Sequence, residues 1–205
     1  MKVFLVRHGQ TTDNRDKLHS HPTHSVLTDL GKIQAEKVAK RMLCEDIDKY
    51  IVSTTIRTRQ TAKPIYMQTS TDIVFDADIQ EVIFGKYAGL PSSALKVDQE
   101  ASGVDYMDFV PEGGESRNQF KKRITSAYER IIKENQGENI CLICHGGVIR
   151  VLLGYLFTDP YNDEKYRCNN TGINLIEYEF ETPKLIYAGD LSHLEENETG
   201  VTNLE

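Results

Sequence analysis

The chain has 205 residues, of which 39% are hydrophobic and 27% are charged, and this composition is typical of a soluble globular protein with one core of ordinary size. Its formal net charge of −7 argues against a nucleic-acid-binding protein, which needs a basic face, but it does not exclude a small anionic substrate. No run of about 18 apolar residues predicts a membrane span, and an apolar strand at the N-terminus leaves no space for a signal peptide, so we expect a cytoplasmic protein without a membrane partner.

Residues 2–6 form a short, largely apolar run with the length and composition of a buried strand. The run ends at Arg7, His8 and Gly9, after which most side chains are polar. In open α/β sheets, ligands bind outside the carboxyl ends of the strands. The planar fork of an arginine suits a phosphoryl group, and a neutral histidine can attack phosphorus, so this strand end indicates phosphate chemistry.

The segment from His19 to His24 contains a third histidine, His21, and such a cluster suggests a metal site. However, no carboxylate or thiolate has matching spacing, and the serine and proline in the same segment are typical of a loop. We therefore predict a solvated loop near the site and no bound metal.

Helices and strands are expected to alternate over the next part of the chain. A helix capped by Thr28 or Asp29 should continue to residue 43, because apolar residues recur at helical spacing. Residues 50–53 read as a second buried strand, which a polar elbow at 54–62 joins to another helix. Residues 73–75 are expected to form a third short strand.

A polar insert at residues 91–111, with a short helix at 92–100, separates these elements from the second half of the chain. Ser116 and Gln119 have the spacing of a capping box for a long helix. Residues 139–144 are apolar throughout, which predicts a strand in the centre of a parallel sheet.

The last third of the chain is expected to contain a helix at residues 148–157 and a closing pair of strands at 173–180 and 184–187. We find no internal repeat and no linker, so we predict a single domain over residues 1–205. Residues 195–205 are acidic and poor in core residues, and we expect them to form a mobile tail.

Four cysteines suit reduced cytosolic thiols better than a disulfide framework. Cys141 and Cys144 have the spacing of a redox motif, but side chains three apart on a strand point to opposite faces, so we do not expect a redox or metal role. The same geometry argues against a cysteine protease that pairs Cys144 with His145, since adjacent strand residues diverge.

Several segments along the chain resemble the histidine phosphatase superfamily, the phosphoglycerate-mutase-like enzymes. They are VRHGQTTDN at residues 6–14, LTDLGKIQA at 27–35, the segment 54–62 that contains Arg57, the segment 79–89 that contains Glu81, GGES at 113–116 and HGG at 145–147. The resemblance covers nearly the whole chain in order. It implies an α/β fold, a three-layer sandwich with a mostly parallel central sheet and helices on both faces.

The resemblance also implies an active site in which the first histidine is transiently phosphorylated. The implied catalytic residues are His8, Glu81 and His145, and the implied phosphate-binding residues are Arg7, Asn14, Arg57 and Gly146. Arg57 rather than Arg59 aligns with the phosphate-binding arginine of the family. Two arginines and a protonated His145 supply the positive charge that phosphoryl transfer needs, so we expect neither a metal nor another cofactor.

These residues predict a metal-independent phosphomonoesterase of the histidine acid type, which hydrolyses a small phosphorylated metabolite. The alternatives are a phosphoglycerate mutase and a non-catalytic protein that binds phosphorylated ligands. We favour a phosphatase because residues 89–111 are too short for the long insertion of mutases, and because Gln10 and Thr11 resemble the phosphatase branch. We expect substrate choice to depend on residues 91–111 and on the His19–His24 loop, while the sequence is silent on the oligomeric state.

Overall fold

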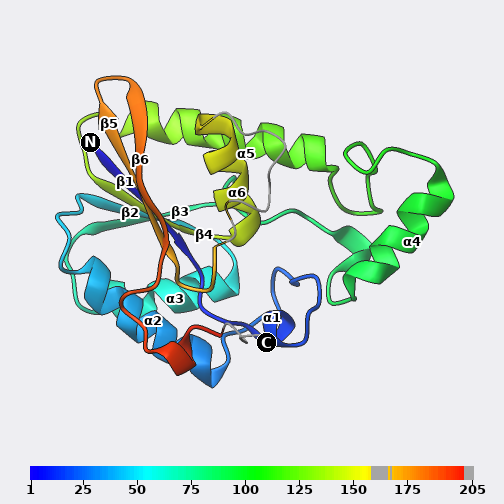
Figure 1. The fold of residues 1–205 in the computed structure, drawn as a ribbon, viewed down its shortest axis with the longest axis horizontal. Coiled ribbons are helices and arrows are strands. Elements are labelled where there is room, and N and C mark those ends of the chain that lie inside the picture. Colours follow the sequence, from blue (N-terminus) through cyan, green and yellow to red (C-terminus); the bar gives the residue numbers. More distant parts are fainter. Residues whose placement is uncertain (158–165, 167, 201–205) are drawn as a thin grey trace.

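The centre of the molecule is a six-stranded sheet, and the computed structural model describes residues 1–157, 166 and 168–200 (Figure 1). The strands are β1 (Lys2–Arg7), β2 (Lys49–Ser53), β3 (Asp72–Asp76), β4 (Ile140–Cys144), β5 (Ile173–Glu179) and β6 (Thr182–Asp190). Their order is β3-β2-β4-β1-β5-β6. The first four are mutually parallel, whereas β5 is antiparallel to both β1 and β6. The predicted mostly parallel sheet, with the apolar strand at its centre and a strand pair at one edge, is confirmed.

Two pairs of long helices cover the two faces of this sheet (Figure 1). One pair is α2 (Asp29–Met42) and α3 (Ile56–Tyr66), and the other is α5 (Arg117–Glu134) and α6 (Gly146–Leu156). The helix starts follow the expected capping chemistry: Thr28 accepts a hydrogen bond from the Gly31 amide, and Ser116 forms a reciprocal capping box with Gln119. The expected three-layer sandwich is confirmed.

The core is divided by the sheet, and β4 shows how. Cys141 and Ile143 pack on the side of α2 and α3, whereas Leu142 and Cys144 pack on the side of α5 and α6. Full burial of one such aliphatic side chain contributes about 1.5–3 kcal/mol. The two thiols therefore point to opposite faces, as expected, and burial raises the pKa of each.

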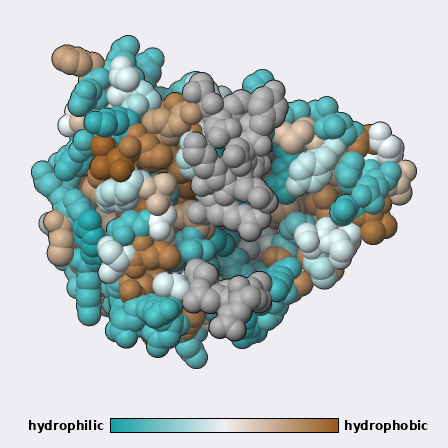
Figure 2. Space-filling model, viewed as in Figure 1, coloured by the Kyte–Doolittle hydropathy of each residue, from teal (hydrophilic) through white to brown (hydrophobic). Residues whose placement is uncertain are grey.

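A smaller lobe projects from the sandwich on the side of α4 (Ser92–Ser102), at the right of Figure 1. This helix is two residues longer than expected and ends at Gly103, whose φ of 67° suits glycine. Figure 2 shows hydrophobic and hydrophilic residues intermixed on this lobe, where Val97 is 63% exposed. No helix among the described residues is long and apolar enough to cross a membrane.

Three short elements complete the described chain: α1 (Thr12–Arg15), η1 (Gly85–Tyr87) and η2 (Glu196–Glu198). The last of these bears on the expected mobile tail. Glu195 and Glu198 form ion pairs with Lys37 of α2, so residues 195–200 pack against the sandwich, while residues 201–205 lie outside the described part. These contacts were not predicted, because the basic partner lies far away in the sequence, and the mobility of the tail stays a prediction.

Candidate active site

The two histidines of the resemblance meet where β1 and β4 end. The strands are parallel neighbours with Arg7 opposite Cys144, so the residue after each strand emerges at the same edge. The His8 amide donates to the Cys144 carbonyl at 3.1 Å. The centroids of the His8 and His145 rings are 5.3 Å apart, with 62° between the planes, and both side chains are buried.

The backbone sets the tautomer of His8. Its Nδ1 lies 2.8 Å from the Gly9 carbonyl oxygen, which can only accept, so Nδ1 carries the proton. Burial lowers the pKa of His8 well below its ordinary value, and the positive charges of Arg57 and Arg7 lower it further. The ring is therefore neutral near pH 7, and the lone pair on Nε2 is available as a nucleophile.

His145 lies between Arg57 and Ser53. The Arg57 Nε–H donates to Nδ1 of His145 at 3.2 Å, so Nε2 carries the proton and donates to the Ser53 hydroxyl at 2.9 Å. Burial, followed by the charge of Arg57, lowers the pKa of His145 well below its ordinary value. The protonated form that we expected from the sequence therefore requires the negative charge of a phosphoryl group beside the ring. Ser53 was not predicted, although it ends a buried strand at the same sheet edge.

Two cationic side chains of the site have no carboxylate partner among the described residues. Arg57 is 1% exposed, donates to the His21 carbonyl at 3.1 Å, and has its pKa lowered by burial to about 10. Arg7 donates from Nη1 to the Cys168 carbonyl at 2.7 Å, while its Nε is buried without a hydrogen-bond partner. Neither forms an ion pair within the described part of the chain. Because buried cations are normally paired, this arrangement favours an anionic ligand.

The alternative arginine, Arg59, lies on the outside of α3. It donates to the Thr54 carbonyl at 3.0 Å and lies over the Phe75 ring, with 4.4 Å between the guanidinium carbon and the ring centroid. Of the two arginines weighed from the sequence, the structure therefore brings Arg57 to the histidines and leaves Arg59 exposed.

The carboxylate of Glu81 faces the start of α6. Its Oε2 accepts from the Gly147 amide at 2.9 Å and its Oε1 from the Val82 amide at 3.0 Å. A Cβ atom at position 147 would lie 2.1 Å from Glu81 Oε1, so a larger residue there would push the Glu81 carboxylate away from the start of α6. The sequence did not predict this contact of Gly147, because Glu81 is 66 residues away.

The two remaining predicted phosphate-binding residues, Gly146 and Asn14, differ in how many groups they have available for a phosphoryl oxygen. Gly146 is the first residue of α6, and a Cβ atom there would come within 3.3 Å of Arg7 Nε. Asn14 caps α1 instead: its Oδ1 accepts from the Thr11 amide at 3.2 Å and from Asn170 Nδ2 at 3.1 Å. Only its amide nitrogen remains as a donor toward a phosphoryl oxygen.

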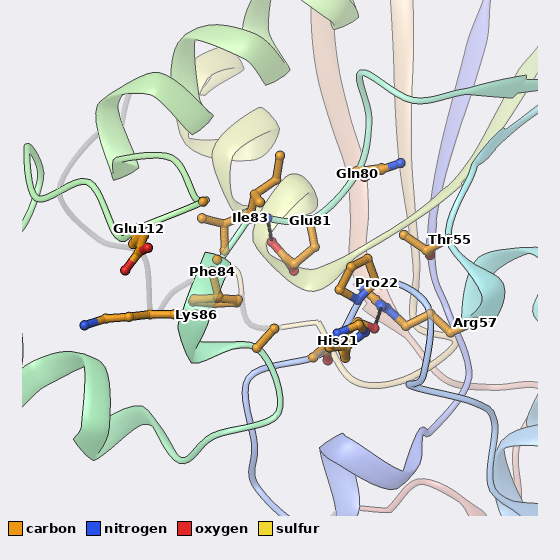
Figure 3. A pocket seen from close by; sticks show the side chains of 15 residues that line it. His21, Pro22, Thr55, Arg57, Gln80, Glu81, Ile83, Phe84, Lys86 and Glu112 are labelled. Carbon is orange, nitrogen blue, oxygen red and sulfur yellow. Dashed lines mark hydrogen bonds between the residues drawn. The ribbon is translucent and has the colours of Figure 1, made fainter.

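A cavity of about 550 Å³ opens beside these groups (Figure 3). Figure 3 shows Arg57 and His21 on one side of it, Lys86 and Glu112 on the other, and Glu81 between them. The wall next to Glu81 is largely apolar and consists of Val82, Ile83, Phe84 and Ala88. Of the predicted site residues, Arg57 and Glu81 line the cavity, and the neighbouring apolar wall offers a surface for the remainder of an organic molecule.

The histidine loop forms part of the cavity wall. The His19 ring stacks on Phe84 with 3.8 Å between centroids, whereas His21 and His24 face each other with their Nδ1 atoms 3.0 Å apart. Over the described ranges, no group of three or more histidine, cysteine or acidic residues is placed to hold a metal ion.

The buried histidines predict acid sensitivity of the fold. Burial lowers the pKa of His8 and His145, and also of His19 and His193, below the ordinary value of 6.5. Below about pH 6.5 the unfolded chain binds more protons than the native state. The free energy of unfolding is therefore highest above that pH and falls as the pH is lowered. Each fully buried histidine should reduce the free energy of unfolding by up to about 1.4 kcal/mol per pH unit.

Urea unfolding at pH 7, 6 and 5 measures this loss. The His8→Ala variant removes one titrating group and should show a smaller loss of stability between pH 7 and pH 5 than the native chain. Equal stability of the native chain at pH 7 and pH 5 would contradict the assignment of neutral buried histidines.

Comparison with known proteins agrees with this geometry. The family model described as Histidine phosphatase superfamily (branch 1) matches residues 3–190. A probable phosphatase of Schizosaccharomyces pombe, C1687.21, is 33% identical over 211 residues and covers 98% of both chains. A probable phosphoglycerate mutase, GpmB, of Yersinia enterocolitica is 29% identical and covers 95% of both chains.

Solved structures give the same fold. A putative alpha-ribazole-5'-P phosphatase from Escherichia coli aligns with a TM-score of 0.84 at 22% identity, covering 93% of this chain and 96% of that one. A phosphoserine phosphatase from Entamoeba histolytica, solved in complex with 3-phosphoglyceric acid, aligns with a TM-score of 0.79 at 26% identity, covering 95% and 99% of the two chains.

Proposed function

Because the chain belongs to the histidine phosphatase superfamily (branch 1), we propose that it is a metal-independent phosphomonoesterase that forms a phosphohistidine intermediate on His8. The observation that carries this proposal is the pair of arginines, Arg7 and Arg57, which flank a neutral histidine and have no carboxylate partner in the described chain. A phosphoryl group bound there satisfies both cations and meets the free Nε2 of His8.

In the first proposed step, His8 Nε2 attacks phosphorus and the bond between phosphorus and the ester oxygen breaks. Arg7, Arg57 and His145 stabilise the charge on the equatorial oxygens. Glu81, in its protonated form, transfers a proton to the leaving oxygen, which departs as an alcohol. Glu81 borders the apolar part of the cavity, so the leaving group lies against that wall.

In the second proposed step, water attacks the phosphohistidine. Glu81, now a carboxylate, takes a proton from the water as the oxygen–phosphorus bond forms and the nitrogen–phosphorus bond breaks. Inorganic phosphate leaves and neutral His8 is restored. The carbonyl of Gly9 keeps Nδ1 protonated throughout, so Nε2 remains the reacting atom.

The alternative to test is a phosphoglycerate mutase, because relatives named as probable mutases match over 95% of the chain. A mutase must protect its phosphohistidine from water, whereas a phosphatase must admit water. We expect inorganic phosphate to be released from several phosphomonoesters, with little interconversion of 2- and 3-phosphoglycerate. Efficient interconversion with slow phosphate release would reverse this assignment.

Metal dependence is a separate prediction. Since Arg7 and Arg57 occupy the place where other phosphatases use a metal cation, excess chelator should leave the rate of phosphate release within about twofold of the untreated enzyme. Loss of activity in chelator that zinc or magnesium restores would instead point to the facing imidazoles of His21 and His24, and a His24→Ala variant would then be inactive as well.

We also propose a cytoplasmic location. The structure has free thiols at Cys44, Cys141, Cys144 and Cys168, which suit a reducing compartment. We propose a small phosphorylated metabolite as substrate because the cavity volume is of the size that encloses a small organic ligand.

A further inference from the structure

The loop that carries His8 has no free backbone donor. Five successive amides have acceptors: His8 N donates to Cys144 O (3.1 Å), Gly9 N to Thr61 Oγ1 (3.0 Å), Gln10 N to Gln34 Oε1 (2.8 Å), Thr11 N to Asn14 Oδ1 (3.2 Å) and Thr12 N to Val26 O (3.1 Å). Three of these acceptors are side chains. The loop is therefore held by specific side chains rather than by a continuing strand.

One of the five bonds acts directly on the nucleophile. The Gly9 carbonyl and the Gln10 amide belong to a single planar peptide unit, so they turn together. The carbonyl accepts from His8 Nδ1 at 2.8 Å, and the amide donates to Gln34 Oε1 at 2.8 Å. The orientation of this peptide, and with it the tautomer of His8, therefore depends on the side chain of Gln34.

Gln34 is itself fixed at its other end. It lies on α2, is completely buried, and donates from Nε2 to the Glu198 carbonyl at 2.7 Å. The carboxylates of Glu198 and Glu195 pair with Lys37, one turn along the same helix, at 2.6 and 2.9 Å. Because one end of the amide must accept and the other must donate, these two partners determine which way it points.

The Gln10 carbonyl, which belongs to the next peptide, packs closely against the first turn of α2. A Cβ atom at Gly31 of α2 would lie 2.0 Å from the Gln10 carbonyl oxygen, and one at Gly9 would lie 2.6 Å from the Gly31 carbonyl oxygen. The loop and the first turn of α2 are thus in direct backbone contact. This packing fixes the carbonyl side of Gln10, and the hydrogen bond from the Gln10 amide to Gln34 Oε1 is what holds the Gly9–Gln10 peptide.

We propose that Gln34 is a positioning residue for the phosphoryl-transfer reaction, and that it acts by holding the Gly9–Gln10 peptide so that His8 keeps its proton on Nδ1. The segment at residues 195–200 is part of the device, because it orients the Gln34 amide. This inference rests on the proposed function of His8 as the nucleophile. Gln34 contacts the peptide that orients His8 and none of the proposed phosphate-binding groups, so its effect should fall on kcat rather than on KM.

The first test compares Gln34→Leu with Lys32→Ala. Lys32 lies on the same helix and makes only an exposed ion pair with Asp29 in the described chain, so its variant controls for general effects on α2. Gln34→Leu should lower the burst rate of p-nitrophenyl phosphate cleavage by about 10- to 100-fold with KM within about twofold, as expected for a misplaced nucleophile. An unchanged burst rate, or a higher KM with unchanged kcat, would overturn the proposal.

A Gln34→Glu variant provides a second test that does not depend on a large packing change. A neutral carboxyl group can accept from Gln10 and donate to the Glu198 carbonyl, as the native amide does, whereas the ionised group can only accept. The ratio of its kcat to that of the native enzyme should therefore rise as the pH is lowered. A ratio that is independent of pH, measured on folded protein, would contradict a positioning role.

A third readout separates this inference from the proposed function. The ¹⁵N chemical shifts of the His8 ring distinguish the Nδ1–H from the Nε2–H tautomer without any substrate. The native protein should show the Nδ1–H form, and Gln34→Leu should show a substantial share of the other. If the native protein has no phosphatase activity, this shift still tests Gln34, and an unaltered tautomer in the variant would overturn its role.

Discussion

Turnover of phosphomonoesters should be lost when His8 is replaced by alanine, by a factor on the order of 10⁶, as when other enzymes lose a covalent nucleophile. The reason is that Nε2 of His8 is the proposed nucleophile, and no other group of the proposed mechanism forms the bond to phosphorus. The fold should survive, because the backbone bond from residue 8 to the Cys144 carbonyl does not involve the ring. Steady-state hydrolysis of p-nitrophenyl phosphate and far-ultraviolet circular dichroism measure the two quantities.

If His8 is the nucleophile, the phosphohistidine intermediate itself should be detectable in the native enzyme. Rapid quenching of the native enzyme during turnover should trap a phosphoenzyme that is labile in acid and stable in base. His24→Ala, which removes an exposed imidazole from the neighbouring loop, should form the same intermediate at the native rate. Normal turnover by His8→Ala would end the proposed mechanism, whatever the behaviour of the control.

The fold was predictable because its signals are local. The run at β4 is apolar at every position, which indicated a central strand, and the capping residues Thr28 and Ser116 marked helix starts within a few residues. The layer arrangement was expected from the resemblance to the histidine phosphatase superfamily, and it agrees with the need of parallel strands for crossover helices on both faces. The boundary errors are small: α6 begins two residues before the predicted start, since Gly146 already has helical geometry.

The site was predictable only in part. Parallel strands place their carboxyl ends at one edge, so His8, His145 and Arg57 were expected to meet there, and they do. The support around them depends on contacts between distant parts of the chain. Three hydrogen-bonded contacts join segments that are more than 60 residues apart: Gly147 with Glu81, Gln34 with Glu198, and Asn170 with His8. No local sequence pattern encodes such pairs.

Replacing Glu81 by glutamine should slow the phosphorylation step by about 10²- to 10⁴-fold for alkyl phosphates, which is the usual contribution of a general acid. An alkoxide is a strong base and leaves poorly without a proton. p-Nitrophenolate is already stable and needs little help, so the burst with p-nitrophenyl phosphate should change far less. Glu81 borders the apolar wall of the cavity, so an alkyl leaving group that lies against this wall has its oxygen next to the Glu81 carboxyl group.

A matched control separates chemistry from disturbance of the cavity. Glu112 lines the same cavity on its far side, and Glu112→Gln removes one negative charge from the wall without reaching the reacting oxygen. It should therefore affect alkyl and aryl substrates equally and weakly. In Glu81→Gln, the amide can accept from only one of the two backbone donors at Gly147 and Val82, so the binding of inorganic phosphate should be measured to show that the site is intact.

The difference between substrates must be sought in the first turnover. Glu81 is also the proposed base for hydrolysis of the phosphohistidine, and that step is common to all substrates. If it limits the steady state, Glu81→Gln will slow alkyl and aryl phosphates equally there and differently only in the burst. Equal, small effects in the burst would remove Glu81 from the mechanism. Glu115 is a poor replacement, because Arg123 Nε and the Ile83 amide each donate to it at 3.1 Å, which holds its carboxylate in place.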